Sequence, residues 1–205
     1  MANWILFRTF PKDDYLCRLA LESFKRVGIE GNFIFLAEEG SYKYLTETGG
    51  KFIFRNEYGG HSNFGGQLGV RDLINSFKTI DIKDEDVVYL SDSDIVLKEK
   101  LIPTSDLEGT GGFRIINHVS GQLQMMKGKF FNHLKSLTNE DITSIVFDEM
   151  IPMGLNIADD TFNSYIAHKY NYTVQFHEGK WVHDKLYKYS GNMNFENVIK
   201  DVCNL

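Results

Sequence analysis

Short apolar segments alternate with amphipathic segments through the first half of the chain, and this alternation limits the possible folds more than any other feature. Apolar and aromatic runs predict four β-strands, at residues 3–10, 32–37, 51–56 and 86–91. Helical spacing of apolar side chains predicts helices at 13–28 and 67–78. Strands that alternate with helices indicate an α/β fold with a mixed, mostly parallel, Rossmann-like sheet flanked by helices.

The second half of the chain is less regular, but it contains enough predicted structure to complete the same domain. Strands are expected at 111–116, 121–128 and 172–178, and helices at 129–137, 140–151 and 159–171. Asp159 or Asp160 is expected to cap the last helix. No repeat and no Pro- or Ser-rich linker separates the halves, so we predict one domain over residues 1–205.

Composition argues against several classes of protein. A net charge of −6 and a pI near 5.5 provide no general attraction for nucleic acid. Cys17 and Cys203 lack the spacing of a disulfide framework or zinc site, and Cys17 is expected in the core. The sequence shows no signal-type leader and no apolar run that would span a membrane, so we expect a cytoplasmic protein.

Two aspartates follow the fourth predicted strand, in the segment "VVYLSDSD". Ligands of open parallel sheets bind beyond the carboxyl ends of the strands, where Asp92 and Asp94 would lie. A tight turn would direct both carboxylates toward one point, and such oxygens suit Mg²⁺ or Mn²⁺ with a substrate phosphate. The segment therefore predicts a metal site, and the alternative is a solvated turn.

A strand that ends in this D-x-D triplet, within an α/β domain that begins with a strand, resembles the metal-dependent GT-A fold glycosyltransferases. The resemblance implies that Asp92 and Asp94 bind Mn²⁺ or Mg²⁺, which holds the diphosphate of a nucleotide-sugar donor, with a UDP-sugar favoured. It assigns nucleotide binding to residues 1–95, and acceptor binding with completion of the metal site to 96–205. The acceptor remains open among a glycan, a lipid-linked sugar, a protein and a modified base, and the oligomeric state is not indicated.

Glycogenin-like and bacterial galactosyltransferase-like members of that family complete the metal site with a distant histidine. In "KWVHDKLYKY" the matching residue is His183, and Lys185 or Lys188 would contact the diphosphate. The Gly and Pro-Trp that usually surround the lysine are absent here. The alternative for His183 is a partly exposed loop histidine.

The resemblance also implies further contacts to the donor. At the end of the first strand, Arg8 would bind a phosphate, Thr9 the base or ribose, and Phe10 would line the nucleoside pocket. A surface ion pair is the alternative for Arg8. Ser93 and Arg71 complete the implied donor contacts.

The remaining assignments concern two glycines near the ligand, polar residues of one strand and two carboxylates. Gly65 and Gly66 would allow close approach of the backbone, or form a plain flexible loop. "HVSGQLQ" is similar to the family strand that lies beneath the donor sugar. This similarity implies that Ser120, Gly121 and Gln122 or Gln124 contact the sugar. The alternative is that the segment is only a half-buried strand. Asp159 and Asp160 match the position of the catalytic base in inverting members, with Asp159 favoured as base and Asp160 as cap.

The resulting hypothesis is transfer of a sugar to an acceptor hydroxyl, with the stereochemistry left open. A nucleotidyltransferase acting on a sugar phosphate is one alternative, but it usually carries a Gly-rich phosphate loop after the first strand, and none is present. A non-catalytic carbohydrate-binding α/β domain is the other alternative.

Overall fold

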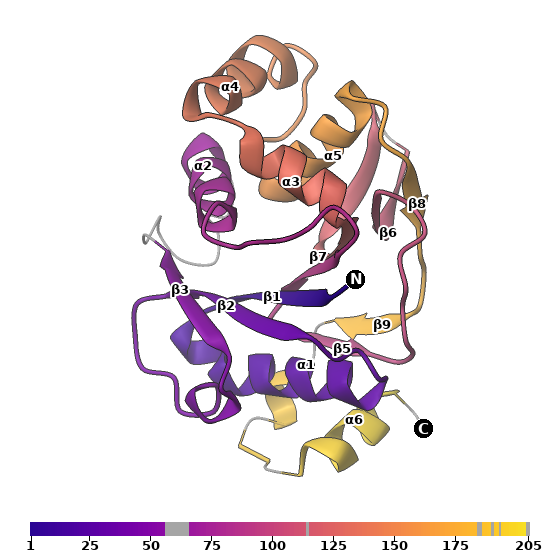
Figure 1. The fold of residues 1–205 in the computed structure, drawn as a ribbon. Helices are drawn as coiled ribbons and strands as arrows, with labels where there is room; N and C mark the ends of the chain where they lie inside the picture. Colours follow the sequence, from indigo (N-terminus) through magenta and orange to yellow (C-terminus); the bar gives the residue numbers. More distant parts are fainter. Residues whose placement is uncertain (56–65, 114, 184–185, 190, 193, 204–205) are drawn as a thin grey trace.

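A seven-stranded sheet runs through the molecule, with helices on both of its faces (Figure 1). The computed structural model describes residues 1–55, 66–113, 115–183, 186–189, 191–192 and 194–203. In spatial order the strands are β3 (Lys51–Arg55), β2 (Asn32–Glu38), β1 (Asn3–Thr9), β4 (Val87–Asp92), β7 (Asn117–Lys127), β6 (Leu107–Phe113) and β8 (Val174–Phe176).

The strand directions confirm the predicted α/β class with a mixed, mostly parallel sheet. β1 pairs in parallel with β2 and β4, β2 pairs in parallel with β3, and β8 pairs in parallel with β6. β7 runs antiparallel to both β4 and β6. The carboxyl ends of β1 and β4 therefore lie side by side, and their register places Arg8 opposite Asp92.

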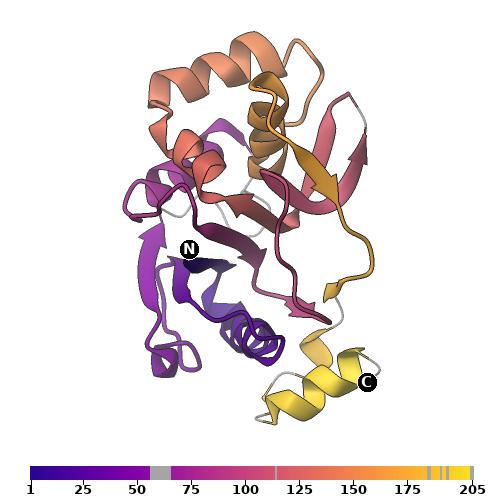
Figure 2. The ribbon, with the colours of Figure 1, turned by 45° about the vertical axis from the view of Figure 1, so that its right-hand side comes forward.

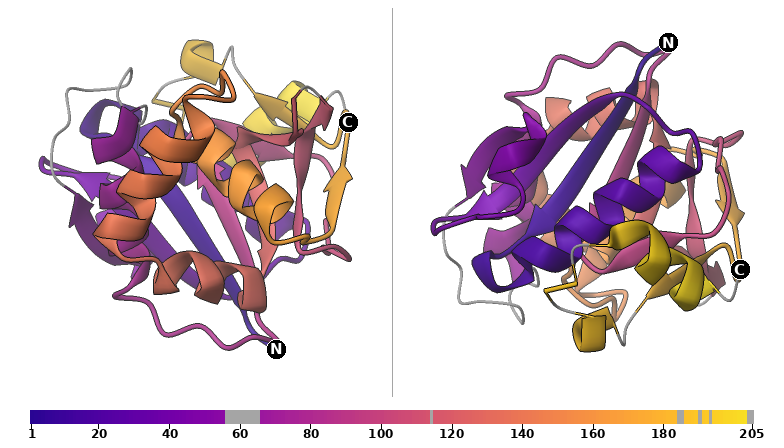
Figure 3. Two further views of the ribbon diagram at one scale, coloured as in Figure 1. Left: turned by 90° about the horizontal axis from the view of Figure 1, so that it is seen from above. Right: turned by 90° about the horizontal axis from the view of Figure 1, so that it is seen from below.

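Two groups of helices enclose the sheet. They are α1 (Asp14–Arg26), α2 (Gly66–Phe77), α3 (Gly128–Ser136), α4 (Asn139–Ser144), α5 (Asp159–Lys169) and α6 (Phe195–Cys203). Figures 1 and 3 show α1 and α6 on one side of the sheet and α2 to α5 on the other. Buried aromatic and aliphatic side chains fill both interfaces. For example, Phe7 of β1 packs on Phe24 of α1, and Phe77 of α2 packs on Phe131 of α3.

Local structure departs from the sequence expectations in two helices. The helix expected at 140–151 is α4 followed by a π-helical segment, Ile145–Met150. The expectation that Asp159 or Asp160 caps α5 is wrong, because Ala158 is the N-cap residue and makes no side-chain capping bond. Both aspartates instead occupy the first turn, where negative charge is favourable at the amino end of the helix dipole.

A second, two-stranded sheet is formed by β5 (Ile95–Leu97) and β9 (Trp181–His183), and the sequence did not predict it. β5 follows the D-x-D turn and pairs antiparallel with β9. In this pairing Ile95 lies opposite His183. A residue far along the chain is thereby placed beside Asp94.

Both cysteines are free and buried, and the burial of Cys17 confirms its predicted place in the core. Among the described residues, no helix is long and apolar enough to cross a membrane.

Candidate active site

Three potential metal ligands converge at the carboxyl end of β4. Asp92 is the last residue of the strand, and the turn at residues 93–94 reverses the chain into β5. Asp94 lies in that turn, and its Oδ1 is 3.3 Å from Nε2 of His183 on β9. One ligand atom from each of Asp92, Asp94 and His183 lies within 4.8 Å of the others. We refer to these three residues as the acidic triad.

The chemistry of the acidic triad fits a divalent cation. The two carboxylates supply the hard oxygen ligands that Mn²⁺ and Mg²⁺ prefer, and the imidazole nitrogen is a ligand typical of transition-metal ions. Burial, together with repulsion from Asp159 and Asp94, raises the pKa of Asp92 to about 6, although Arg8 and His183 act in the opposite direction. Asp92 therefore carries a charge that its protein neighbours only partly compensate, and a bound cation would complete the compensation.

Arg8 links the acidic triad to the start of α5. Its side chain is only 4% exposed, and Nη2 lies 2.7 Å from Asp92 Oδ1. Nη1 donates to Asp159 Oδ2, and Nη2 also donates to the carbonyl oxygen of Gly121. Burial alone would lower the pKa of Arg8, but the carboxylates of Asp159 and Asp92 raise it above its ordinary value. The guanidinium is thus a buried cation, and not the surface ion-pair partner that was the alternative for this residue.

α5 packs against β7 (Figure 2). Polar contacts between the two elements position the first turn of the helix. The backbone N–H of Val119 donates to Ser164 Oγ at 2.9 Å, and Asn163 Nδ2 donates to Gln124 Oε1 at 2.8 Å. Both helix residues are buried, so these bonds form away from water and resist displacement. The N–H of Gly121 then donates to Asp160 Oδ2 at 3.0 Å.

Gly121 occupies a position where a side chain would be crowded. A Cβ atom there would lie 3.2 Å from Arg8 Nη2 and 3.3 Å from Asp160 Cβ. Its carbonyl group and its N–H bind Arg8 and Asp160 respectively. One glycine therefore fixes the spacing between the buried cation and the second aspartate of α5.

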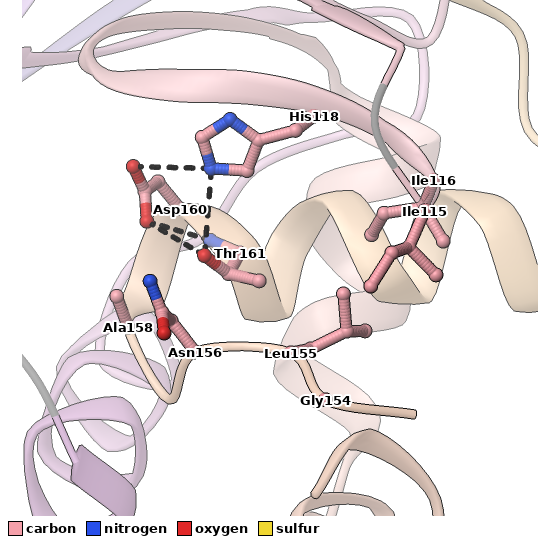
Figure 4. Close-up of a pocket in the computed structure, with 9 residues that line it drawn as sticks. All are labelled: Ile115, Ile116, His118, Gly154, Leu155, Asn156, Ala158, Asp160 and Thr161. Atoms are coloured by element: carbon pink, nitrogen blue, oxygen red, sulfur yellow. Dashed lines mark hydrogen bonds and ion pairs between the residues drawn. The ribbon is translucent and has the colours of Figure 1, made fainter. Parts of the chain in front are cut away.

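Asp160 faces a cavity of about 380 Å³, which is drawn in Figure 4. Its Oδ2 is 3.5 Å from His118 Nε2, and Thr161 Oγ1 is 3.4 Å from the same nitrogen. Burial acts to raise the pKa of Asp160, but His118 and the N–H groups of Gly121 and Thr161 lower it below its usual value. The carboxylate at this end of the cavity is therefore ionised at neutral pH.

The remaining sequence-predicted residues lie in several places. Thr9, Phe10 and Ser93 are buried, and the Thr9 hydroxyl interacts with Cys17. Ser120 and Gln122 are partly exposed on β7. Positions 65 and 185, where Gly65 and Lys185 were assigned, lie outside the described residues, and Gly66 begins α2.

Two of the residues predicted to contact the donor, Arg71 and Lys188, have other surroundings in the structure. Arg71 lines a different cavity, which it shares with residues of α4 and the π-helical segment. Lys188 is exposed, and its Nζ lies 4.6 Å from the ring centre of Tyr189. In the described part of the chain, Arg8 is the arginine that reaches Asp92.

His118, Asn156 and Thr161 line the cavity and were not identified from the sequence. His118 had a usable signal, because alternate residues of a strand share a face and it precedes Ser120 by two positions. Asn156 lies in the segment before α5 and carries no local pattern. Its place in the cavity depends on tertiary packing.

The fold is that of the GT-A glycosyltransferases, as the resemblance predicted. The galactosyltransferase LgtC, solved with donor and acceptor sugar analogues, superposes with a TM-score of 0.56 at 10% identity, over 98% of this chain and 83% of LgtC. The mannosyltransferase PcManGT from Pyrobaculum calidifontis, solved with GDP-Man and Mn²⁺, gives 0.55 at 12% identity, over 87% of this chain and 55% of that protein. Mouse xyloside xylosyltransferase 1 gives 0.51 at 11% identity, over 98% of this chain and 93% of that protein.

Comparisons of sequence alone find no relative. No protein-family model matches the chain, and no curated protein sequence matches it. The similarity to known proteins therefore lies in the fold.

Proposed function

We propose that the protein is a glycosyltransferase that moves a sugar from a nucleotide-diphosphate sugar to an acceptor hydroxyl, with Mn²⁺ or Mg²⁺ as its metal. The observation that carries the proposal is the acidic triad at the carboxyl edge of a GT-A sheet. The structures of LgtC with donor and acceptor sugar analogues, and of the mannosyltransferase with GDP-Man and Mn²⁺, support it by analogy of fold.

Asp92, Asp94 and His183 would hold the cation. A divalent ion bound there would neutralise the charge that develops on the departing diphosphate. Arg8 would keep Asp92 oriented toward this site and hold Asp159 beside it. In this assignment Arg8 is a positioning residue for the ligands, and its contact with the carboxylates replaces the direct phosphate contact expected from the sequence.

The transfer step exchanges one bond for another at the anomeric carbon of the donor. The bond from that carbon to the phosphate oxygen breaks, and its electron pair stays with the nucleoside diphosphate. The acceptor oxygen forms the new bond, and its proton passes to a carboxylate. Asp160 is our candidate for that base, because it faces the cavity while Asp159 is buried against Arg8.

A donor screen tests the proposal. Nucleotide release would be measured for UDP-, GDP- and CMP-sugars with Mn²⁺, with Mg²⁺ and with EDTA, and a UDP-sugar is the first candidate donor. We expect metal-dependent release with one class of donor. Asp92→Asn and Asp94→Asn should each reduce it by at least about 100-fold, because each removes a charged ligand.

Asp81→Asn is the matched control, since Asp81 is an exposed aspartate in the segment before β4, far along the strand from the acidic triad. This variant should retain the activity of the unaltered protein. Full activity of Asp92→Asn or Asp94→Asn would contradict the proposal, as would release that EDTA does not affect.

A further inference from the structure

The cavity beside Asp160 has two chemically different ends (Figure 4). His118, Asp160 and Thr161 gather at one end, with Asn156 next to them. The side chains of Ile115, Ile116 and Leu155 gather at the other end. A ligand that fills this space must therefore be polar at one end and apolar at the other.

The polar end lies next to the proposed donor site. Asp160 directly follows Asp159, which binds Arg8, and Arg8 in turn binds Asp92 of the acidic triad. A hydroxyl group that donates to Asp160 would thus lie on the side of the cavity nearest the donor. The apolar end extends away from it, between the β6–β7 connection and the segment before α5.

Further apolar side chains are exposed along or beside the same two segments. They are Phe113 (78%), Ile151 (44%) and Met153 (37%), and Ile115 of the cavity wall is itself 52% exposed. A free sugar presents hydroxyl groups on most of its surface, and each loses hydrogen bonds to water when it meets an aliphatic wall. The aliphatic end instead favours methylene groups, which gain free energy when they leave water.

We propose that this cavity binds the acceptor, and that the acceptor is an amphipathic alcohol: a hydroxylated compound, such as a glycoside, that carries an aliphatic aglycone. Its hydroxyl lies at Asp160 and His118, and its aliphatic part packs on Ile115, Ile116 and Leu155. The inference rests on the proposed function for the role of the ligand as acceptor. The volume of about 380 Å³ is in the ordinary range for small-molecule sites.

Paired glycosides provide the test. Binding of methyl and n-octyl glycosides of glucose, galactose and mannose, below the micelle concentration and without donor, would be measured by calorimetry. We expect the octyl form of at least one sugar to bind ten times or more tighter than its methyl form. Burying only two of the added methylene groups accounts for about that factor.

Ile115→Ser tests the location of the aliphatic part. Ile115 is half exposed, so the variant should fold, and the octyl-to-methyl ratio of affinities should fall at least about threefold. Phe147→Ser is the matched control, because Phe147 is 50% exposed and lines the other cavity. This control should leave the ratio unchanged. Equal binding of the two glycosides, or a ratio that both variants lower alike, would overturn the inference.

The result of the glycoside test can be distinguished from the result of the donor screen. An octyl preference that Ile115→Ser weakens, together with no metal-dependent nucleotide release from any donor, would refute the acceptor role and the proposed function while leaving the ligand class intact. Metal-dependent donor release without an octyl preference would refute the inference alone. Asp160→Asn should retain the octyl preference and lose sugar transfer, because it removes the base and leaves the aliphatic wall in place.

Discussion

Arg8 places one buried guanidinium between two buried or partly buried carboxylates, Asp92 and Asp159. A buried charge is costly unless it is paired, and removal of one partner leaves the others without compensation. The pKa of Asp92 is already raised to about 6 with Arg8 present. The residue that stabilises the site electrostatically is therefore also one on which the folded state depends.

Arg8→Met should lower the free energy of unfolding by about 3–5 kcal/mol, because it leaves two carboxylates near each other without their shared cation. Urea denaturation of the metal-free protein measures this loss. Arg71→Met, at a partly exposed position of α2, should change the same quantity by less than about 1 kcal/mol. A loss for Arg8→Met no larger than that of the control would mean that the buried ion pairs contribute little.

The pH dependence of metal binding follows from Asp92. Its pKa is raised from 3.8 to about 6, so the folded chain holds this proton more tightly than the unfolded chain. Asp92 therefore favours folding most below about pH 4, and that contribution is lost as the pH rises through about 6. Since a metal competes with the same proton, the stabilisation by Mn²⁺ should appear over that upper range.

Melting temperatures with and without Mn²⁺, recorded near pH 5 and near pH 7.5, test this. We expect a clear increase with Mn²⁺ at the higher pH and a much smaller one at the lower pH. Asp92→Asn should abolish the increase at both values. An equal increase at both values in the unaltered protein would show that protonation of Asp92 does not limit binding.

At the scale of elements, the contact between α5 and β7 determines the geometry of the site. The buried bonds of Ser164 and Asn163 hold the helix in place, and Gly121 sets how near its first turn approaches Arg8. β7 is an interior strand of the sheet, paired on both sides. A small displacement of its backbone would consequently shift Asp160 relative to the acidic triad.

Gly121→Ala should displace both Arg8 and Asp160, because the new methyl group would lie 3.2 Å and 3.3 Å from their atoms. We expect a destabilisation of about 1–3 kcal/mol and a fall in transfer rate that exceeds any fall in donor affinity. Denaturation curves and steady-state kinetics measure these. Gly112→Ala is the matched control on β6, since its Cβ would meet no atom within 4 Å. Normal kinetics for Gly121→Ala would mean that the strand can adjust.

The elements that local pattern predicted are those whose apolar side chains form long runs or a helical period. β1, β2 and α1 match their predicted ranges closely for this reason. β5 and β9 contain three residues each, too few to show any period, and they pair across most of the second half of the chain. Their pairing depends on the tertiary fold and cannot be predicted from the residue pattern of either segment alone.

The same distinction applies to the candidate site. Asp92 and Asp94 were identified from their place after a strand, which is a local pattern. His183 was identified through resemblance to a family, and the structure now supplies the physical reason, since β9 pairs with β5 directly after Asp94. The ion pair of Arg8 with Asp159 joins distant segments, so the sequence shows that both residues are present but does not show that they pair.

For the whole molecule, a cation in the acidic triad would connect β4, in the first half, with β9, near the end of the chain. Mn²⁺ should therefore slow backbone hydrogen exchange in β5 and β9, because bound metal opposes the local separation of the two strands. Mass spectrometry of exchanged peptides measures this, and EDTA should reverse it. Peptides from α4 serve as the internal control, and equal slowing there would point to a global effect instead.

The apolar walls of the Asp160 cavity come from the β6–β7 connection and the segment before α5, and neither segment carries a residue of the acidic triad. Substitutions in these walls would change what the cavity admits without altering the ligands proposed for the donor. Related chains with this fold would then be free to diverge in acceptor while they share one donor chemistry. Comparison of these two segments among homologous sequences would show whether they vary while the acidic triad stays the same.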